Sequence, residues 1–265
     1  MEILNLKGLL ITALIFVPIE HLFALRPNQK ILRKAFFNDL IYAVFNNAPI
    51  TIGLIATISA ATKALSWLVP EFVSLAISSQ PLWLQVVEIV LIADIGFYFA
   101  HRAFHAIPVL WNFHAIHHSI EDLDWLAGHR IHPVDQVLTK SASFIPVYLL
   151  GFTGESIAIF ALIFHAHALL LHANVRLRIG PLRWLIASPQ FHHWHHANER
   201  TAYNKNFAGQ LSFLDVIFGT MYLPGKTVPE RYGVDDPIPT NYIEQLAYPL
   251  VPKRKNSEAP SSGDA

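Results

Sequence analysis

The sequence predicts an all-α integral membrane protein, a helical bundle with about four membrane segments and a helical cap on the cytoplasmic side. Hydrophobic residues make up 53% of the 265 residues and charged residues only 14%, whereas soluble domains are roughly one-quarter charged. The mean hydropathy is +0.37. Long apolar stretches alternate with polar segments over the first two thirds of the chain.

Charge and cysteine content exclude several classes of function. The chain has 19 lysines and arginines against 19 aspartates and glutamates, so it has no excess positive charge with which to bind nucleic acid. Cysteine is absent, which excludes disulfides, thiolate zinc sites, iron–sulfur clusters and a cysteine nucleophile. Any metal must therefore be held by nitrogen or oxygen ligands.

Three apolar stretches predict the first three membrane helices. Residues 8–25 approach the roughly 30 Å thickness of the hydrocarbon core. A cleaved signal peptide is the alternative for this stretch, although only Lys7 supplies positive charge before it. The second stretch covers residues 40–61, and the third covers 82–100 and leads directly into His101.

The fourth apolar region, residues 144–171, is divided by Pro146 and by the Gly-Phe-Thr-Gly-Glu segment at 151–155. Each piece is short for a membrane crossing, so a re-entrant hairpin or two tilted helices fits better than one straight helix. If the basic loop at 26–34 is cytoplasmic, 17 of the 19 lysines and arginines lie inside, as the positive-inside rule requires. The chain after the third helix is then cytoplasmic apart from the hairpin.

Histidine is the unusual residue, because 14 of the 15 histidines lie between residues 101 and 196. Eight of them form three motifs with helical spacing: His101-x3-His105, His114-x2-His117-His118 and His192-x2-His195-His196. Residues at i, i+3 and i+4 project from one helical face, so we expect each motif to place its imidazoles within reach of one ion. Eight nitrogen ligands exceed what one tetrahedral or octahedral ion accepts, so the motifs predict a histidine-rich dimetal site in the cap.

Imidazole suits zinc, copper, iron and nickel, so ligand type alone does not select the metal. The HExxH zinc signature and the ExxH pairs of soluble di-iron bundles are both absent. The ordered motifs and their flanking segments resemble the membrane-bound fatty acid hydroxylase and sterol desaturase superfamily. The segments that carry the resemblance are DIGFYFAHRAFH at 94–105, WNFHAIHHS at 111–119, RIHP at 130–133, HANV at 172–175, SPQFHHWHH at 188–196 and FLDVIFGTMYLP at 213–224.

This resemblance implies a centre of two iron ions that uses O2 as co-substrate to hydroxylate or desaturate an aliphatic C–H position of a lipid. It implies ten metal ligands: His101, His105, His114, His117, His118, His132, His172, His192, His195 and His196. His193 is interpreted as a residue beside the site or on the surface. His129, His165 and His167 stay open between ligands and a polar stripe against the metal-binding helices.

Two polar residues are predicted to support catalysis. Asp94 lies seven residues before His101, two turns along the same helical face, and a carboxylate at this depth requires a partner. We expect it to orient His101 or His105, and a water-solvated carboxylate at the helix end is the alternative. Asn174 is a second candidate of this kind.

Two electrons per turnover must come from an external electron-donor protein of the reductase, cytochrome or ferredoxin type, docking on the cytoplasmic face. The chain itself has no nucleotide-binding glycine motif, no cysteine for an iron–sulfur cluster and no HPGG haem signature. We expect three parts: membrane helices and a basic loop over 1–89, a fatty acid hydroxylase-like domain over 90–225, and a partly disordered cytoplasmic tail over 226–265.

Two other classes of function stay open, a membrane zinc hydrolase and a histidine-rich metal transporter. A transporter needs histidines on facing helices near the bilayer midplane, whereas these lie in polar stretches that also contain Arg102, Arg130 and Arg200. The sequence does not select the lipid, since an acyl chain and a sterol are lined by the same apolar residues. It does not select hydroxylation over desaturation either, because that choice depends on the exact placement of one C–H bond.

Overall fold

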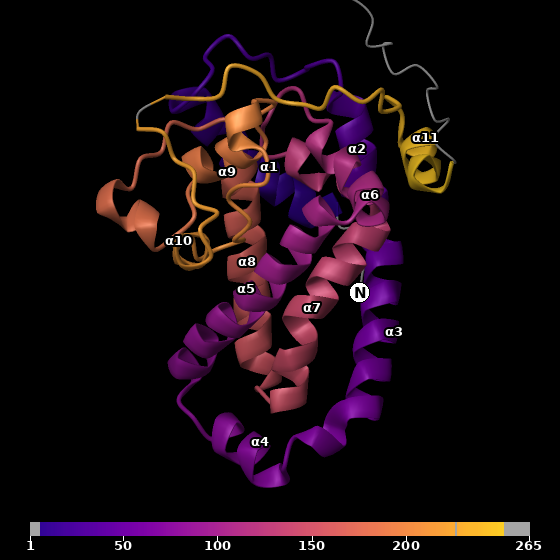
Figure 1. The fold of residues 1–265 in the computed structure, drawn as a ribbon, viewed down its shortest axis with the longest axis vertical. Helices are drawn as coiled ribbons and strands as arrows, with labels where there is room; N and C mark the ends of the chain where they lie inside the picture. The colour runs from indigo at the N-terminus through magenta and orange to yellow at the C-terminus, as the bar shows by residue number, and fades with distance from the viewer. Residues whose placement is uncertain (1–5, 226, 252–265) are drawn as a thin grey trace, which may run out of the picture.

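The computed structural model describes residues 6–225 and 227–251, and the regular structure in that part is helical (Figure 1). The α-helices are α1 (Leu6–Leu22), α2 (Phe36–Phe45), α3 (Asn47–Leu65), α4 (Glu71–Ser78), α5 (Leu82–Ala106), α6 (Pro108–His118), α7 (Pro133–Leu150), α8 (Gly154–His172), α9 (Pro189–His195), α10 (Phe213–Ile217) and α11 (Tyr242–Ala247). Five 3-10 turns accompany them: η1 (Ser66–Leu68), η2 (Ala127–His129), η3 (Gly180–Trp184), η4 (Arg200–Ala202) and η5 (Tyr248–Leu250). The all-α fold class is confirmed. The disorder predicted for the tail falls mainly on residues 252–265, which lie outside the described part.

The long helices α3, α5, α7 and α8 run along the length of the molecule, and α4 lies at one end (Figure 1). The shorter helices α6, α9 and α10 gather with the long loops at the other end (Figure 1). Helix α5 packs against α6, α7 and α8, and α3 packs against α7. We call the group of short helices and loops at this end the cap.

Within the described residues, three segments are long and apolar enough to cross a membrane: Asn47–Leu68, Leu82–Ala106 and Gly154–His172. The second predicted stretch is broken at Asn46, between α2 and α3, so its membrane-length part begins later than expected. The first stretch forms α1 of 17 residues, about 25 Å long, which is less than the hydrocarbon thickness.

The fourth apolar region forms two helices, one of the two predicted arrangements, and both are longer than the sequence indicated. Helix α7 begins at Pro133, which suits the first position of a helix, and continues for 18 residues through Pro146. It ends at Leu150, and Gly151 follows with φ 82°. Helix α8 begins after Thr153, whose side chain accepts a hydrogen bond from the backbone N–H of Ser156. With 19 residues, α8 is long enough to span a bilayer, which the prediction of two short pieces missed.

Glycine allows α5 and α7 to approach closely. A Cβ added at Gly96 would lie 2.2 Å from the carbonyl oxygen of Ala142, a backbone atom that cannot rotate away. The two helices carry His101 and Asp135, so their separation also sets the geometry of the cap.

We expect Gly96→Ala to force α5 and α7 apart and to destabilise the protein by about 1–3 kcal/mol, the usual range for overpacking. The measurement is the midpoint of thermal unfolding in detergent. Gly154→Ala is the matched control, because a Cβ there meets no atom within 4 Å. Equal midpoints for the two variants would show that the helices can separate without loss.

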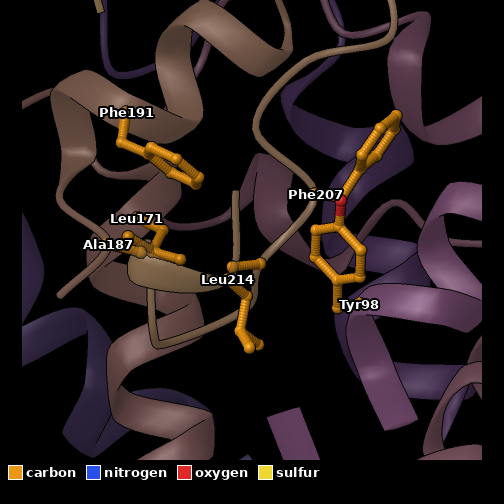
Figure 2. Close-up of a cluster of buried hydrophobic side chains, with 7 residues drawn as sticks. Tyr98, Leu171, Ala187, Phe191, Phe207 and Leu214 are labelled. Atoms are coloured by element: carbon orange, nitrogen blue, oxygen red, sulfur yellow. The ribbon is translucent and has the colours of Figure 1, made fainter. Parts of the chain in front are cut away.

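A hydrophobic cluster forms the core of the cap and joins three of the helices that carry the histidines, α5, α8 and α9. Figure 2 shows Tyr98 from α5, Leu171 from α8 and Phe191 from α9 together with Phe207 and Leu214. The Tyr98 and Phe207 rings meet edge to face with centroids 6.0 Å apart. Because all of these side chains are buried, the three helices are held in one relative position by packing.

Candidate metal centre

The structure brings nine of the ten predicted ligands together at the cap end of the bundle. Among the described residues, His101, His105, His114, His118 and His195 form one group, and His117, His172, His192 and His196 form a second. In each group the candidate ligand nitrogens all lie within 4.8 Å of one another. We call them the five-histidine group and the four-histidine group. They lie side by side, since the rings of His118 and His196 stack at 4.6 Å.

The two groups do not follow the three sequence motifs, and the expectation of one motif per ion is wrong. In His114-x2-His117-His118, the first and last histidines join the five-histidine group and His117 joins the other. In His192-x2-His195-His196, the middle histidine again crosses to the other group. An α-helix turns about 40° from i to i+4 but about 60° the opposite way from i to i+3. Each HxxHH motif therefore serves both groups.

Local sequence positions these helices. Ser188 caps α9, with its side chain accepting from the N–H of Phe191, and Pro189 occupies the first helical position. Helix α6 likewise begins with Pro108 directly after α5 ends at Ala106. This tight connection places His114 beside His101, with their Nε2 atoms 3.0 Å apart.

Five of the nine histidines point their Nδ1 atoms outward to protein acceptors. They donate to the carbonyl oxygens of Phe207 (from His101, 2.8 Å), Arg130 (from His117, 3.0 Å), Ala168 (from His172, 2.7 Å) and Lys205 (from His195, 2.8 Å), and to the Asp135 carboxylate (from His114, 2.6 Å). A carbonyl oxygen can only accept, so Nδ1 carries the proton. The Nε2 atom of each neutral ring then holds a bare lone pair.

These bare nitrogens face one another at short range. The Nε2 atoms of His117 and His172 lie 3.0 Å apart, and those of His101 and His114 also lie 3.0 Å apart. Two acceptors at this distance repel unless a cation lies between them. An ion bound at about 2.1 Å by each nitrogen places adjacent octahedral ligands about 3.0 Å apart and opposite ones about 4.2 Å apart, so both groups fit a metal ion.

Burial keeps these imidazoles neutral. Desolvation is the largest effect and lowers the pKa of His114, His117 and His195 well below the usual histidine value. Neighbouring histidines lower it further because several rings cannot be protonated together. The buried Nε2 of His105 has no hydrogen-bond partner in the protein, a state that is costly unless the lone pair binds something.

Comparison with known proteins identifies the family of this chain. The fatty acid hydroxylase family model matches residues 86–220, which include all nine grouped histidines. The chain belongs to the fatty acid hydroxylase family. The resemblance found in the motifs is thus confirmed, and the matched range contains both histidine groups.

Three relatives show the range of this similarity. Ornithine lipid hydroxylase of Rhizobium tropici is 34% identical over 176 residues, 65% of this chain and 52% of that protein. Human (Homo sapiens) alkylglycerol monooxygenase is 33% identical over 148 residues, 56% of this chain and 32% of that protein. A very-long-chain aldehyde decarbonylase of Oryza sativa subsp. indica is 26% identical over 59% of this chain and 62% of that protein. The chain spans between about a third and two thirds of these relatives, and no solved structure matches it.

Asp94 supports the fatty acid hydroxylase site through a loop. It is buried, and its carboxylate accepts from the backbone N–H groups of Gly209, Gln210 and Leu211 at 2.9, 3.0 and 2.6 Å rather than from His101 or His105. The same loop contains Phe207, whose carbonyl accepts from His101. Asp94 therefore acts on His101 by holding the backbone that binds it.

His132 and Asn174 lie outside both histidine groups. His132 caps α7: its Nδ1 accepts from the N–H of Val134, and its Nε2 donates to the carbonyl of Leu246, so both ring nitrogens are used. The Asn174 side chain accepts from the backbone N–H of Arg26 at 2.9 Å and donates to the same residue's carbonyl at 3.1 Å. These two hydrogen bonds of Asn174 hold the segment that contains Arg26 against the end of α8.

His193 is fully buried rather than on the surface. Its Nε2 donates to the carbonyl of Ala173, which leaves Nδ1 to accept from the hydroxyl of Tyr232 at 2.7 Å. Burial lowers the pKa of His193 to about 3. This histidine joins α9 to α8 and to the C-terminal segment.

Sequence reasoning missed a buried charge network beside the four-histidine group. The Asp39 carboxylate accepts from Arg33 at 2.6 Å and from Arg130 at 2.5 and 2.9 Å, and Arg33 also binds Asp124 through two hydrogen bonds of 2.6 and 2.7 Å. The backbone carbonyl of Arg130 accepts from His117. No local pattern marks this network, because its members are separated by up to 97 positions.

Proposed function

We propose that this chain is a membrane-bound non-haem di-iron oxygenase that hydroxylates or desaturates an aliphatic C–H position of a lipid with O2. One observation carries the proposal: the Nε2 atoms of His117 and His172 face each other at 3.0 Å while both rings donate Nδ1–H to carbonyls. That arrangement needs a cation. The fatty acid hydroxylase match and the names of the relatives, which concern an ornithine lipid, an alkylglycerol and a very-long-chain aldehyde, support a lipid as substrate.

In this proposal the five-histidine group holds one iron ion and the four-histidine group holds the other. The bound irons supply the oxidation of the C–H bond by O2. The protein keeps the imidazoles neutral by burial and sets their tautomers through the outward hydrogen bonds of Nδ1. It also holds the rings in a cap whose hydrophobic core excludes water from the oxidant.

The site lies at the ends of α5 and α8, so a lipid can reach it from the bilayer. We place this end at the cytoplasmic face, where an external electron-donor protein supplies two electrons per turnover. The three parts of the chain, 1–89, 90–225 and 226–265, belong to the same proposal as membrane helices, oxygenase domain and cytoplasmic tail.

The test uses the full-length protein purified in detergent. We expect about two iron ions per chain and O2 uptake when a chemical reductant and a lipid extract are added. Mass spectrometry of the extract should show one lipid class that gains an oxygen atom or loses two hydrogen atoms. Stoichiometric zinc without O2 uptake would instead favour a zinc hydrolase.

A further inference from the structure

Three nitrogen-bearing side chains next to the metal centre belong to neither histidine group. They are His129 on η2, Lys140 on α7 and His165 on α8, and we call them the Lys140 cluster. The rings of His129 and His165 lie 6.1 Å apart between centroids. The Lys140 ammonium is close enough to interact electrostatically with both rings.

The cluster lacks an internal counter-charge. Within residues 6–225 and 227–251, Lys140 makes no ion pair or side-chain hydrogen bond, and the buried Nε2 of His129 has no partner. The carboxylates of α7 and α8 are Asp135 and Glu155, and Asp135 is bound to His114. An ionisable group without a partner among apolar helices is energetically unfavourable and marks a functional site in a membrane protein.

The cluster lies just below the metal centre. A Cβ added at Gly128, next to His129, would lie 3.1 Å from the ring of His172, so η2 packs on the four-histidine group. His165 precedes His172 by seven residues on α8, about 10 Å along the helix axis. Lys140 follows Asp135 by five residues on α7, about 7.5 Å along its axis.

The cluster is also open to the surroundings of the bundle. His165 is exposed, and His129 and Lys140 are partly buried. Leu162, one turn before His165 on α8, is 71% exposed. Because α8 is one of the membrane-length helices and its surface beside His165 is apolar, a ligand of the cluster reaches it from the lipid phase.

We propose that the Lys140 cluster binds the anionic oxygens of the substrate's polar group, a phosphate or a carboxylate. The inference rests on the proposed function and names its substrate class, a lipid that carries a negative charge. An ammonium can only donate, and because no carboxylate of α7 or α8 forms an ion pair with Lys140, the cluster repels a cationic group and attracts an anion. Because the cluster lies within about 10 Å of the histidine groups along both helices, the oxidised carbon is near the polar group and not at the far end of a long chain.

The experiment measures binding without turnover. The iron-loaded full chain, in a non-ionic detergent and without O2, is titrated with fluorescent cis-parinaric acid and with its methyl ester. A second pair is a phosphatidic acid and a diacylglycerol that carry the same fluorescent chain. We expect the anionic member of at least one pair to bind about tenfold more tightly than its neutral partner, and the pair that shows this identifies carboxylate or phosphate.

Variants test whether the preference for the anionic lipid depends on the Lys140 cluster. Lys140→Met should abolish the preference, Lys140→Arg should retain it, and His165→Leu, at an exposed position, should weaken it, all with unchanged bound iron. Equal binding of both pairs by the unmodified protein, or a preference that survives Lys140→Met, would overturn the proposal. Since no step is oxidative, a protein that binds anions but never consumes O2 would refute the proposed function and leave this inference standing.

Discussion

Replacing His117 or His195 by alanine is expected to lower bound iron and to abolish lipid oxidation. His117 belongs to the four-histidine group, so His117→Ala leaves three ligands and should lose about one of the two ions. His195 belongs to the five-histidine group, and its Nε2 lies 3.0 Å from that of His118. Loss of His195 leaves four ligands in the five-histidine group. The His195→Ala variant should therefore retain more metal than His117→Ala but still lose turnover.

Iron per chain and oxidised lipid per unit time are the two measurements for these variants. His21→Ala is the control, because His21 is exposed on α1 and lies outside both groups. Both quantities should be unchanged in the control. Near-normal iron and turnover in both His117→Ala and His195→Ala would remove these residues from the ligand set.

Asp39→Ala is expected to have the largest effect among residues outside the histidine groups. Asp39 is fully buried and accepts from both Arg33 and Arg130, so its loss removes the carboxylate that Arg130 binds and leaves Arg33 with Asp124. Removing one partner from a buried ion pair typically destabilises a protein by about 3–5 kcal/mol. Movement of Arg130 should also disturb its carbonyl, which holds His117, and lower the iron bound by the four-histidine group.

The unfolding midpoint in detergent and the iron content are measured for this variant. Asp235→Ala is the matched control, since Asp235 pairs with Arg231 at the surface with both side chains more than 60% exposed. Exposed ion pairs contribute less than about 1 kcal/mol. If the two variants unfolded at the same temperature, the buried network would not be holding the N-terminal segment to the cap.

The composition and the histidine motifs were sufficient to predict an all-α membrane protein, its family and nine histidines that the structure gathers. These features are local, because the length of an apolar stretch and the helical spacing of histidines can be recognised in a short segment of sequence. The prediction was weaker where helix ends depend on neighbours. The sequence predicts a break at Pro146, but helix α7 extends from Pro133 through Pro146 because it packs against α3 and α5.

The supporting contacts were not predictable because they join distant positions. Asp94 lies more than a hundred residues from the three N–H groups that it accepts from, and Arg33 lies 91 residues from Asp124. His132 matches a family histidine in sequence, yet its place as the cap of α7 uses both of its nitrogens. A motif records residue identity and spacing, whereas hydrogen-bond partners depend on which segments pack together.

The division of the histidines between two groups shows most clearly which features follow from sequence alone and which depend on the tertiary structure. Helical spacing establishes that His114, His117 and His118 lie near one another, and this much follows from the chain alone. Which ion each ring serves depends on the angles at which α5, α6, α8 and α9 meet, because each group draws its ligands from several helices. The angles between α5, α8 and α9 are set by the buried cluster around Tyr98 and Phe191, whose members come from separate parts of the chain and meet only on folding.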